Sequence, residues 1–142
     1  MLMKGRDTMS TDRKTLTVEY LNAVSKQHYQ KLEEMLAPDL TVRGPAATRT
    51  SAADFLGALK RLGAIHVRSD VKRVFADGDE VCVIYDFVTD TPAGALTTIE
   101  WLRFDGDRIR SINLYYDQLP WQQVMAVIAE RAGARTAAQP TA

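Results

Sequence analysis

Apolar positions follow two different periods along this chain. Up to residue 63 they recur every three or four residues, which is typical of amphipathic helices. The pattern predicts one broken helix or two over residues 13–37, ended by Pro38, and a short extended piece at 40–43. A further helix is expected to start at Thr50 or Ser51 and end near Gly63. The apolar positions of these helices are Leu16, Tyr20, Ala23, Val24, Leu32, Met35, Leu36, Phe55, Leu56, Leu59 and Leu62.

From Ile65 the period changes to two, which indicates strands with one buried face. Short connections rich in Asp, Gly and Pro separate four such runs. Pro120 is expected at the first position of a last helix, with Trp121, Val124, Met125 and Ile128 on its apolar side and Gly133 after it. The four predicted strands are Ile65–Phe75, Val81–Thr89, Ala95–Phe104 and Arg108–Tyr116.

Helices, then an antiparallel meander, then one helix predict the α+β class. Long strands twist strongly, so the sheet is expected to form a cone (cystatin-like) whose one face is covered by the N-terminal helices. Such a shape encloses a pocket unless side chains fill it. The predicted organisation is a disordered N-terminal tail at 1–12, one domain at 13–133 and a disordered C-terminal tail at 134–142.

The run Ile99–Asp105, followed by Arg108-Ile109 and Tyr115-Tyr116, resembles the last two strands of the ketosteroid isomerases. Val18–Leu21 and Leu40–Val42 before Gly44-Pro45 fit the same pattern in the same order. The chain therefore resembles the NTF2-like, or SnoaL-like, superfamily over roughly residues 15–117. This fold hosts many functions, so the resemblance is more specific for architecture than for chemistry.

The resemblance implies roles for individual residues. The family's oxyanion-binding tyrosine falls on Tyr20, and its protonated carboxylic acid falls on Glu100. Such a neutral buried acid is a known isomerase device. The aspartate that moves the proton would be expected where this chain has Gly44, and two supporting tyrosines correspond to Leu36 and Leu56. Steroid isomerisation by the family's route is therefore not expected.

Strand parity gives a second view of the same pocket. Side chains that share the face of Glu100 alternate with those on the outer face. A buried carboxylate without a partner is costly, so Glu100 should hold a proton or find a donor. The expected pocket face is aromatic and aliphatic: Leu36, Leu56, Val83, Tyr85, Phe87, Thr98, Leu102, Ile112, Leu114 and Tyr116.

The same residues also have a purely structural interpretation. Glu100 could pair with an arginine or lie at an exposed pocket mouth, and Tyr20 could be a core residue with a satisfied hydroxyl. Tyr85 and Tyr116 are expected to be wall residues first. His66 is interpreted as a partly exposed structural histidine at the start of a strand.

The sequence lacks the residue patterns of a disulfide framework, a metal site or a phosphate-binding loop. Cys82 is the only cysteine, which excludes an internal disulfide, and it is expected to be a small buried hydrophobe. His28 and His66 are far apart, so no metal site is expected. Gly78, Gly94 and Gly106 are isolated turn residues rather than a phosphate loop, and no cofactor is predicted.

Composition and charge limit the partners. The 18 basic and 18 acidic residues cancel, so neither nucleic acid nor a membrane surface is an expected partner. No apolar stretch approaches the roughly 18 residues of a membrane span, and the start is not a secretory signal, so a cytoplasmic protein is expected.

The outer sheet face mixes apolar and charged residues. Cys82, Ile84, Trp101 and Tyr115 lie among Asp86, Arg103 and Asn113. A twofold dimer that packs sheet against sheet would cover this face, with Arg103 and Asp86 paired across or within the interface.

Three hypotheses follow. The first is an isomerase- or cyclase-type enzyme that needs no cofactor and acts on a hydrophobic carbonyl compound through Glu100 and Tyr20. The second is a non-catalytic module that binds a small hydrophobic molecule or dimerises. The third is a scaffold whose pocket is filled by its own side chains.

Overall fold

The strands build one curved sheet of six strands in the order β2-β1-β6-β5-β4-β3. The computed structural model describes residues 12–138. Neighbouring strands run antiparallel except β1 and β6, which are parallel. Gly78 and Gly106 adopt a positive φ in the turns before β4 and β6, a conformation that glycine takes without strain. The strands are β1 (Leu36–Arg43), β2 (Thr48–Arg49), β3 (His66–Asp77), β4 (Glu80–Thr89), β5 (Ala95–Asp105) and β6 (Arg108–Tyr115).

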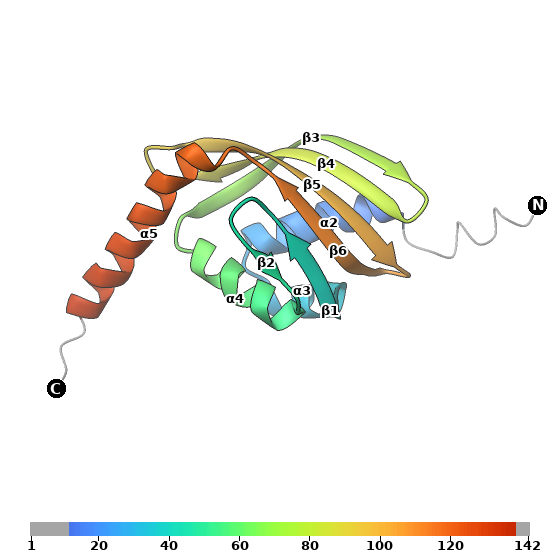
Figure 1. Cartoon of the computed structure of the whole chain (residues 1–142), viewed down its shortest axis with the longest axis horizontal. Helices are drawn as coiled ribbons and strands as arrows, with labels where there is room; N and C mark the ends of the chain where they lie inside the picture. The colour runs from blue at the N-terminus through green and yellow to red at the C-terminus, as the bar shows by residue number, and fades with distance from the viewer. Residues whose placement is uncertain (1–11, 139–142) are drawn as a thin grey trace, which may run out of the picture.

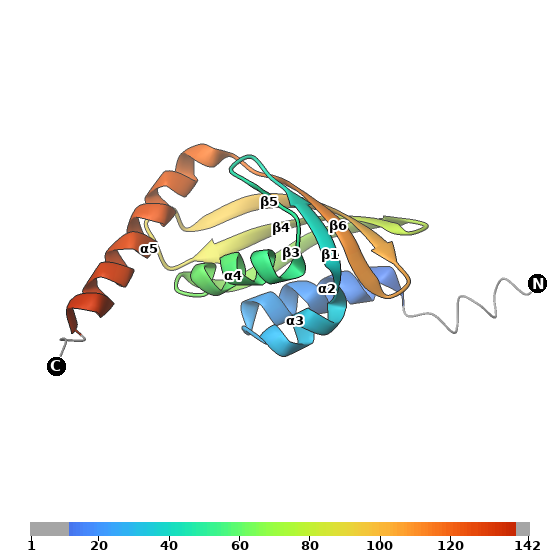
Figure 2. The same cartoon turned by 60° about the horizontal axis from the view of Figure 1, so that its bottom comes forward.

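Helices cover the concave side of the sheet. Figures 1 and 2 show α2 (Arg13–Ser25), α3 (Tyr29–Met35) and α4 (Ala52–Leu62) beneath the curved strands. Helix α5 (Gln118–Ala138) extends from the end of the sheet that lies away from the start of α2. This arrangement confirms the α+β class and the curved sheet with N-terminal helices on one face. Among the described residues, no helix has the length and apolar character that crossing a membrane requires.

Local sequence explains where the helices begin. The Asp12 side chain accepts a hydrogen bond from the backbone N–H of Lys14 at 3.0 Å, and Ser51 accepts from Asp54 at 3.1 Å. These caps satisfy amides that have no partner inside the helix. In α5, Asp117 accepts from the N–H of Leu119 at 3.0 Å.

Three helix boundaries differ from the sequence prediction. The first helical region ends at Met35, because Leu36 already belongs to β1 and faces Ile109 of the parallel neighbour. The last helix begins at Gln118, so Pro120 lies inside its first turn, where the missing N–H costs no helical hydrogen bond. The same helix continues to Ala138, beyond Gly133. Residues 1–11 and 139–142 of the expected tails lie outside the described residues.

The core lies between the concave sheet face and the helices. Along β5 every second side chain is buried, from Leu96 to Phe104, as the two-residue period predicts. Five positions expected to line the pocket are packed into this core: Leu36, Leu56, Val83, Leu102 and Ile112.

Candidate functional site

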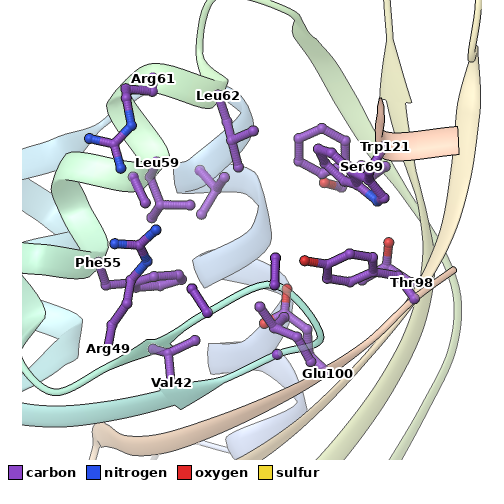
Figure 3. Close-up of a pocket in the computed structure, with 18 of the residues that line it drawn as sticks. Val42, Arg49, Phe55, Leu59, Arg61, Leu62, Ser69, Thr98, Glu100 and Trp121 are labelled. Atoms are coloured by element: carbon purple, nitrogen blue, oxygen red, sulfur yellow. The ribbon is translucent and has the colours of Figure 1, made fainter. Parts of the chain in front are cut away.

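A cavity of about 220 Å³ opens between the sheet, α2, α4 and the start of α5. One buried water needs only roughly 15 Å³, so the cavity has room for an organic molecule. The structure therefore contradicts the hypothesis of a pocket filled by its own side chains. Most of the lining is apolar, and Figure 3 shows Phe55, Leu59 and Leu62 on the α4 side, with Thr98 and Glu100 on the sheet side.

Glu100 is the only carboxylate among the described residues that line this cavity. Its side chain is buried, with 3% of the residue exposed, and it forms no ion pair with residues 12–138. Tyr20 of α2 donates a hydrogen bond to Glu100 Oε1 at 3.0 Å. Tyr85 of β4 donates a short hydrogen bond to Glu100 Oε2. Each carboxyl oxygen thus has its own phenol donor.

Burial raises the pKa of Glu100 to about 7, although the hydrogen bonds from Tyr85 and Tyr20 act in the opposite direction. Burial, together with the nearby Glu100 carboxylate, raises the pKa of both tyrosines well above 10. The two phenols therefore stay protonated and keep donating, whereas the carboxyl group changes charge close to neutral pH. A group that gains and loses a proton at neutral pH is suited to acid–base chemistry.

The strand register places the other predicted residues. Val83 lies opposite Glu100 and Tyr85 opposite Thr98, while Leu114 faces Glu100 from β6. The five predicted wall residues that line the cavity are Tyr85, Phe87, Thr98, Leu114 and Tyr116. The remaining five (Leu36, Leu56, Val83, Leu102 and Ile112) do not line it, because they lie deeper in the packed core.

Several lining residues were missed from the sequence. Most of them come from α2, from α4, from α5 and from the hairpin between β1 and β2, and no strand period reports how these segments fold over the sheet. The available signals were the apolar positions of the three helices, among them Val24, Leu59 and Met125. The residues are Leu21, Val24, Val42, Ala46, Ala47, Arg49, Phe55, Ala58, Leu59, Arg61, Leu62, Ser69, Trp121, Met125 and Ile128.

Trp121 forms part of the cavity wall from the first turns of α5. Its ring packs against Phe87 and Tyr116, with ring centroids 5.4 Å away in each case. Its indole Nε1 is buried and has no hydrogen-bond partner among residues 12–138. An unpaired buried donor is costly, so Trp121 would gain from an acceptor atom on a ligand.

Gly44 lines the cavity at the position where the resemblance would require an aspartate. A Cβ atom at this position would lie 3.3 Å from the Cβ of Leu114 and 3.4 Å from its Cδ1. The space beside Gly44 is therefore taken by Leu114, and a larger side chain would have to displace it. A second proton-transfer carboxylate is absent from this part of the described cavity.

His66 packs behind the residues of the cavity wall and does not line the cavity itself. Its ring stacks on Phe87 at 3.9 Å, and Nε2 lies 3.2 Å from the hydroxyl oxygen of Ser69. Burial lowers the pKa of His66 to about 4, so the imidazole is neutral at pH 7. His66 therefore braces Phe87 and Ser69, both of which line the cavity.

A curved sheet covered by helices over a cavity is the architecture of the NTF2-like fold. Residues 17–112 match the family model of the SnoaL-like domain, and the chain belongs to this family. A comparison with curated proteins found no match.

Solved structures show the same architecture at low sequence identity. One is a hypothetical protein with a ketosteroid isomerase-like fold from Catenulispora acidiphila, in complex with trimethylamine. It is 23% identical with a TM-score of 0.64, covering 72% of this chain and 85% of its own. A proposed SnoaL-like polyketide cyclase from Shewanella putrefaciens is 16% identical with a TM-score of 0.63, over 87% and 90% of the two chains. A de novo designed protein with a curved β-sheet reaches a TM-score of 0.69 at 17% identity, over 84% and 98%.

Proposed function

We propose that this protein is an enzyme that moves a proton on a small hydrophobic carbonyl compound, with Glu100 as the acid–base group. The observation that carries the proposal is the buried Glu100 carboxyl group, which faces an apolar cavity. Burial raises the pKa of this group to about 7. Isomerase- and cyclase-type reactions both need such a group. The similarity to the proposed polyketide cyclase from Shewanella putrefaciens supports the same class of substrate.

The proposed step uses the ionised form of Glu100. The carboxylate takes a proton from the carbon next to the carbonyl; the C–H bond breaks, and its electron pair forms an enolate. The neutral carboxylic acid then returns the proton, either to the same carbon or to another carbon of the conjugated enolate. One residue can act as base and then as acid because the two events are successive.

Tyr20 and Tyr85 act through Glu100. Because their hydroxyl groups donate to its two oxygens, they hold the carboxylate in one orientation and favour its charged form. Tyr20 was expected from the resemblance to donate to the substrate oxygen, and its hydrogen bond to Glu100 makes it a positioning residue in this proposal. The unpaired N–H of Trp121 is the donor available for the oxygen of the bound compound.

Glu100→Gln is expected to reduce proton exchange at least about a hundredfold, because an amide cannot accept the proton. The measurement is the loss of the α-proton NMR signal of β-tetralone in D₂O, compared with the uncatalysed rate. Glu80→Gln is the matched control, since Glu80 lies on the outer face, where it bonds Trp101 and Arg103. Glu100→Asp keeps an acid and is expected to retain part of the activity.

Equal exchange by wild type and Glu100→Gln would contradict the proposal. A second candidate function, a binding module without catalysis, is favoured by Gly44 and Leu114, which leave no second carboxylate beside Glu100. Titration with a phenol such as naphthol separates the two functions. Tight naphthol binding without any tetralone exchange identifies the binding module.

We also infer that two copies pair through the outer sheet face. This face, defined here by Phe75, Cys82, Ile84, Ile99, Trp101 and Tyr115, runs across β3, β4, β5 and β6. Trp101 is 41% exposed and Tyr115 50% exposed, which is a large apolar area to leave in water. Cys82 lies on this face and is half-buried, whereas the sequence analysis expected a buried residue.

Charges around the face are already paired within the chain. Arg103 lies 3.3 Å from Glu80, and Lys72 lies 3.2 Å from Asp86. Within one chain Arg103 and Asp86 therefore pair with other residues, and their pairing across the interface stays a prediction.

Trp101→Glu is expected to convert a dimer into a monomer, because it would bury a charge at the centre of the interface. Sedimentation equilibrium at micromolar concentration measures the mass against the 15.8 kDa of one chain. Leu119→Glu makes the same chemical change at an exposed position on α5 and should leave the dimer intact. A monomeric wild type would contradict the inference.

A further inference from the structure

Two arginines are the only cationic side chains among the described residues that line the cavity. Arg49 comes from β2 and Arg61 from the last turn of α4. Figure 3 shows their guanidinium groups on the α4 side of the cavity, whereas Glu100 and Thr98 lie on the sheet side. The cavity therefore has a cationic edge and a separate acid–base group.

The two guanidinium groups lie along one face of α4. Arg49 Nη1 is 3.0 Å from Asp54 Oδ1, in the first turn of the helix. Arg61 Nη1 lies 4.0 Å from the point that a Cβ atom on Gly57 would occupy. Residues 54, 57 and 61 follow one another on the same side of a helix, and one turn rises about 5.4 Å. The two guanidinium groups thus lie beside residues 54 and 57, which are within one turn of each other on α4.

The charges of this edge do not cancel. Asp54 neutralises Arg49, whereas Arg61 forms no ion pair with residues 12–138. Glu100 lies on the sheet side and is only partly ionised near pH 7, so it offsets the extra positive charge only in part. The field at the α4 edge therefore favours an anion, and guanidinium groups bind oxyanions through directed hydrogen bonds.

We propose that the natural ligand is an amphipathic acid, with an apolar body in the cavity and an oxyanion such as a carboxylate between Arg49 and Arg61. The inference rests on the proposed function, in which the same ligand carries a carbonyl group toward Glu100. The arginine pair determines the orientation of the bound ligand, because the anionic end stays at the α4 edge. The reacting end is thereby directed toward the sheet.

The test compares two probes that share an apolar body. Anilinonaphthalene sulfonate carries an anionic group, whereas phenylnaphthylamine has almost the same rings and no charge. Wild type is expected to bind the sulfonate about tenfold more tightly than the neutral probe, as a charge-assisted contact predicts. Arg61→Gln should remove most of this preference and leave the affinity for the neutral probe unchanged. Arg49→Gln should also reduce the preference, since it leaves the Asp54 carboxylate uncompensated beside the anion.

Lys60→Gln is the matched control. It removes the same charge from the neighbouring position of α4, but Lys60 lies 5.4 Å from the Tyr29 ring and does not line the cavity. Ala58→Trp should fill the cavity and abolish binding of both probes, which places the probes inside it. Equal affinity of wild type for the two probes would overturn this inference and leave the proposed function intact. An unchanged preference in Arg61→Gln would do the same. Failure of both probes to bind overturns the proposed function as well.

Discussion

Replacing Glu100 by glutamine is expected to make the protein more stable above neutral pH by about 3 kcal/mol. In the folded protein, burial raises the pKa of Glu100 from its ordinary value of 4.5 to about 7. Between these two pH values the unfolded chain loses a proton that the native state keeps. Native stability must therefore fall as pH rises through this window, and each pH unit costs about 1.36 kcal/mol. Glutamine stays neutral and removes this loss.

His66 acts in the opposite direction and would obscure the effect in the wild type. Its pKa is lowered from 6.5 to about 4, so the unfolded chain binds a proton that the native state does not. This contribution to stability is present above pH 6.5 and is lost as pH falls toward 4. The two contributions compensate, so the wild type should show a flat profile between about pH 4.5 and 6.5.

Urea denaturation at several pH values measures the difference between wild type and variant. In Glu100→Gln the profile should rise with pH, because only the His66 contribution remains. Glu80→Gln keeps the wild-type profile, since Glu80 is partly exposed and its pairing is on the outer face. Parallel profiles for wild type and Glu100→Gln would contradict a raised pKa at Glu100. The variant that loses activity would thus gain stability, which is the usual relation between a strained functional group and the fold.

Period and turn chemistry were sufficient to predict most of the sheet. The positions of Glu100, Tyr85 and Thr98 on one face follow from a side-chain period of two and from the tight turn between β4 and β5. The alternation of side chains along a strand, however, predicts which face a residue lies on. It does not predict whether that position along the strand reaches the cavity or the packed core. Val83 and Leu102 therefore have the predicted face but lie in the core instead of at the cavity.

The contact between Tyr85 and Glu100 could have been found from the register. Val83 lies opposite Glu100, so Tyr85 is a diagonal neighbour, and such neighbours are about 7–8 Å apart, within reach of a long side chain. By contrast, the pair of arginines at the α4 edge of the cavity could not be predicted without knowing how α4 and the β1–β2 hairpin fold over the sheet. Arg49 and Arg61 have no period in common, and only tertiary packing brings them together.

Leu36 and Leu56 were placed at the pocket by matching positions to the isomerases. Leu36 instead begins β1, and Leu56 points into the core from α4. Replacing a polar tyrosine by leucine removes the hydroxyl that would need a position near the cavity, so the side chain is free to pack with other apolar residues. Glu100 and Tyr20, to which the resemblance assigned catalytic roles, lie in contact in the structure, and their roles stay a prediction.

Tyr85→Phe is expected to destabilise the protein more at about pH 8 than at about pH 5, by about 2 kcal/mol against about 1 kcal/mol. At the higher pH Glu100 is ionised, and the lost hydrogen bond is one to a charged group. The same substitution should raise the pKa of Glu100 further above 7, because the Tyr85 hydrogen bond favours the carboxylate. Tyr20→Phe should act in the same direction through the other oxygen.

Two measurements check this prediction. NMR titration of the Glu100 side-chain carbonyl gives its pKa directly, and urea denaturation at the two pH values gives the cost of each variant. In a Glu100→Gln background the pH-dependence of the Tyr85→Phe cost should vanish, since no charge is left to lose its donor. Tyr115→Phe, on the outer face, should leave both quantities unchanged. An equal cost of Tyr85→Phe at both pH values would mean that the phenol packs against Glu100 without controlling its proton, and the acid–base proposal would lose its positioning groups.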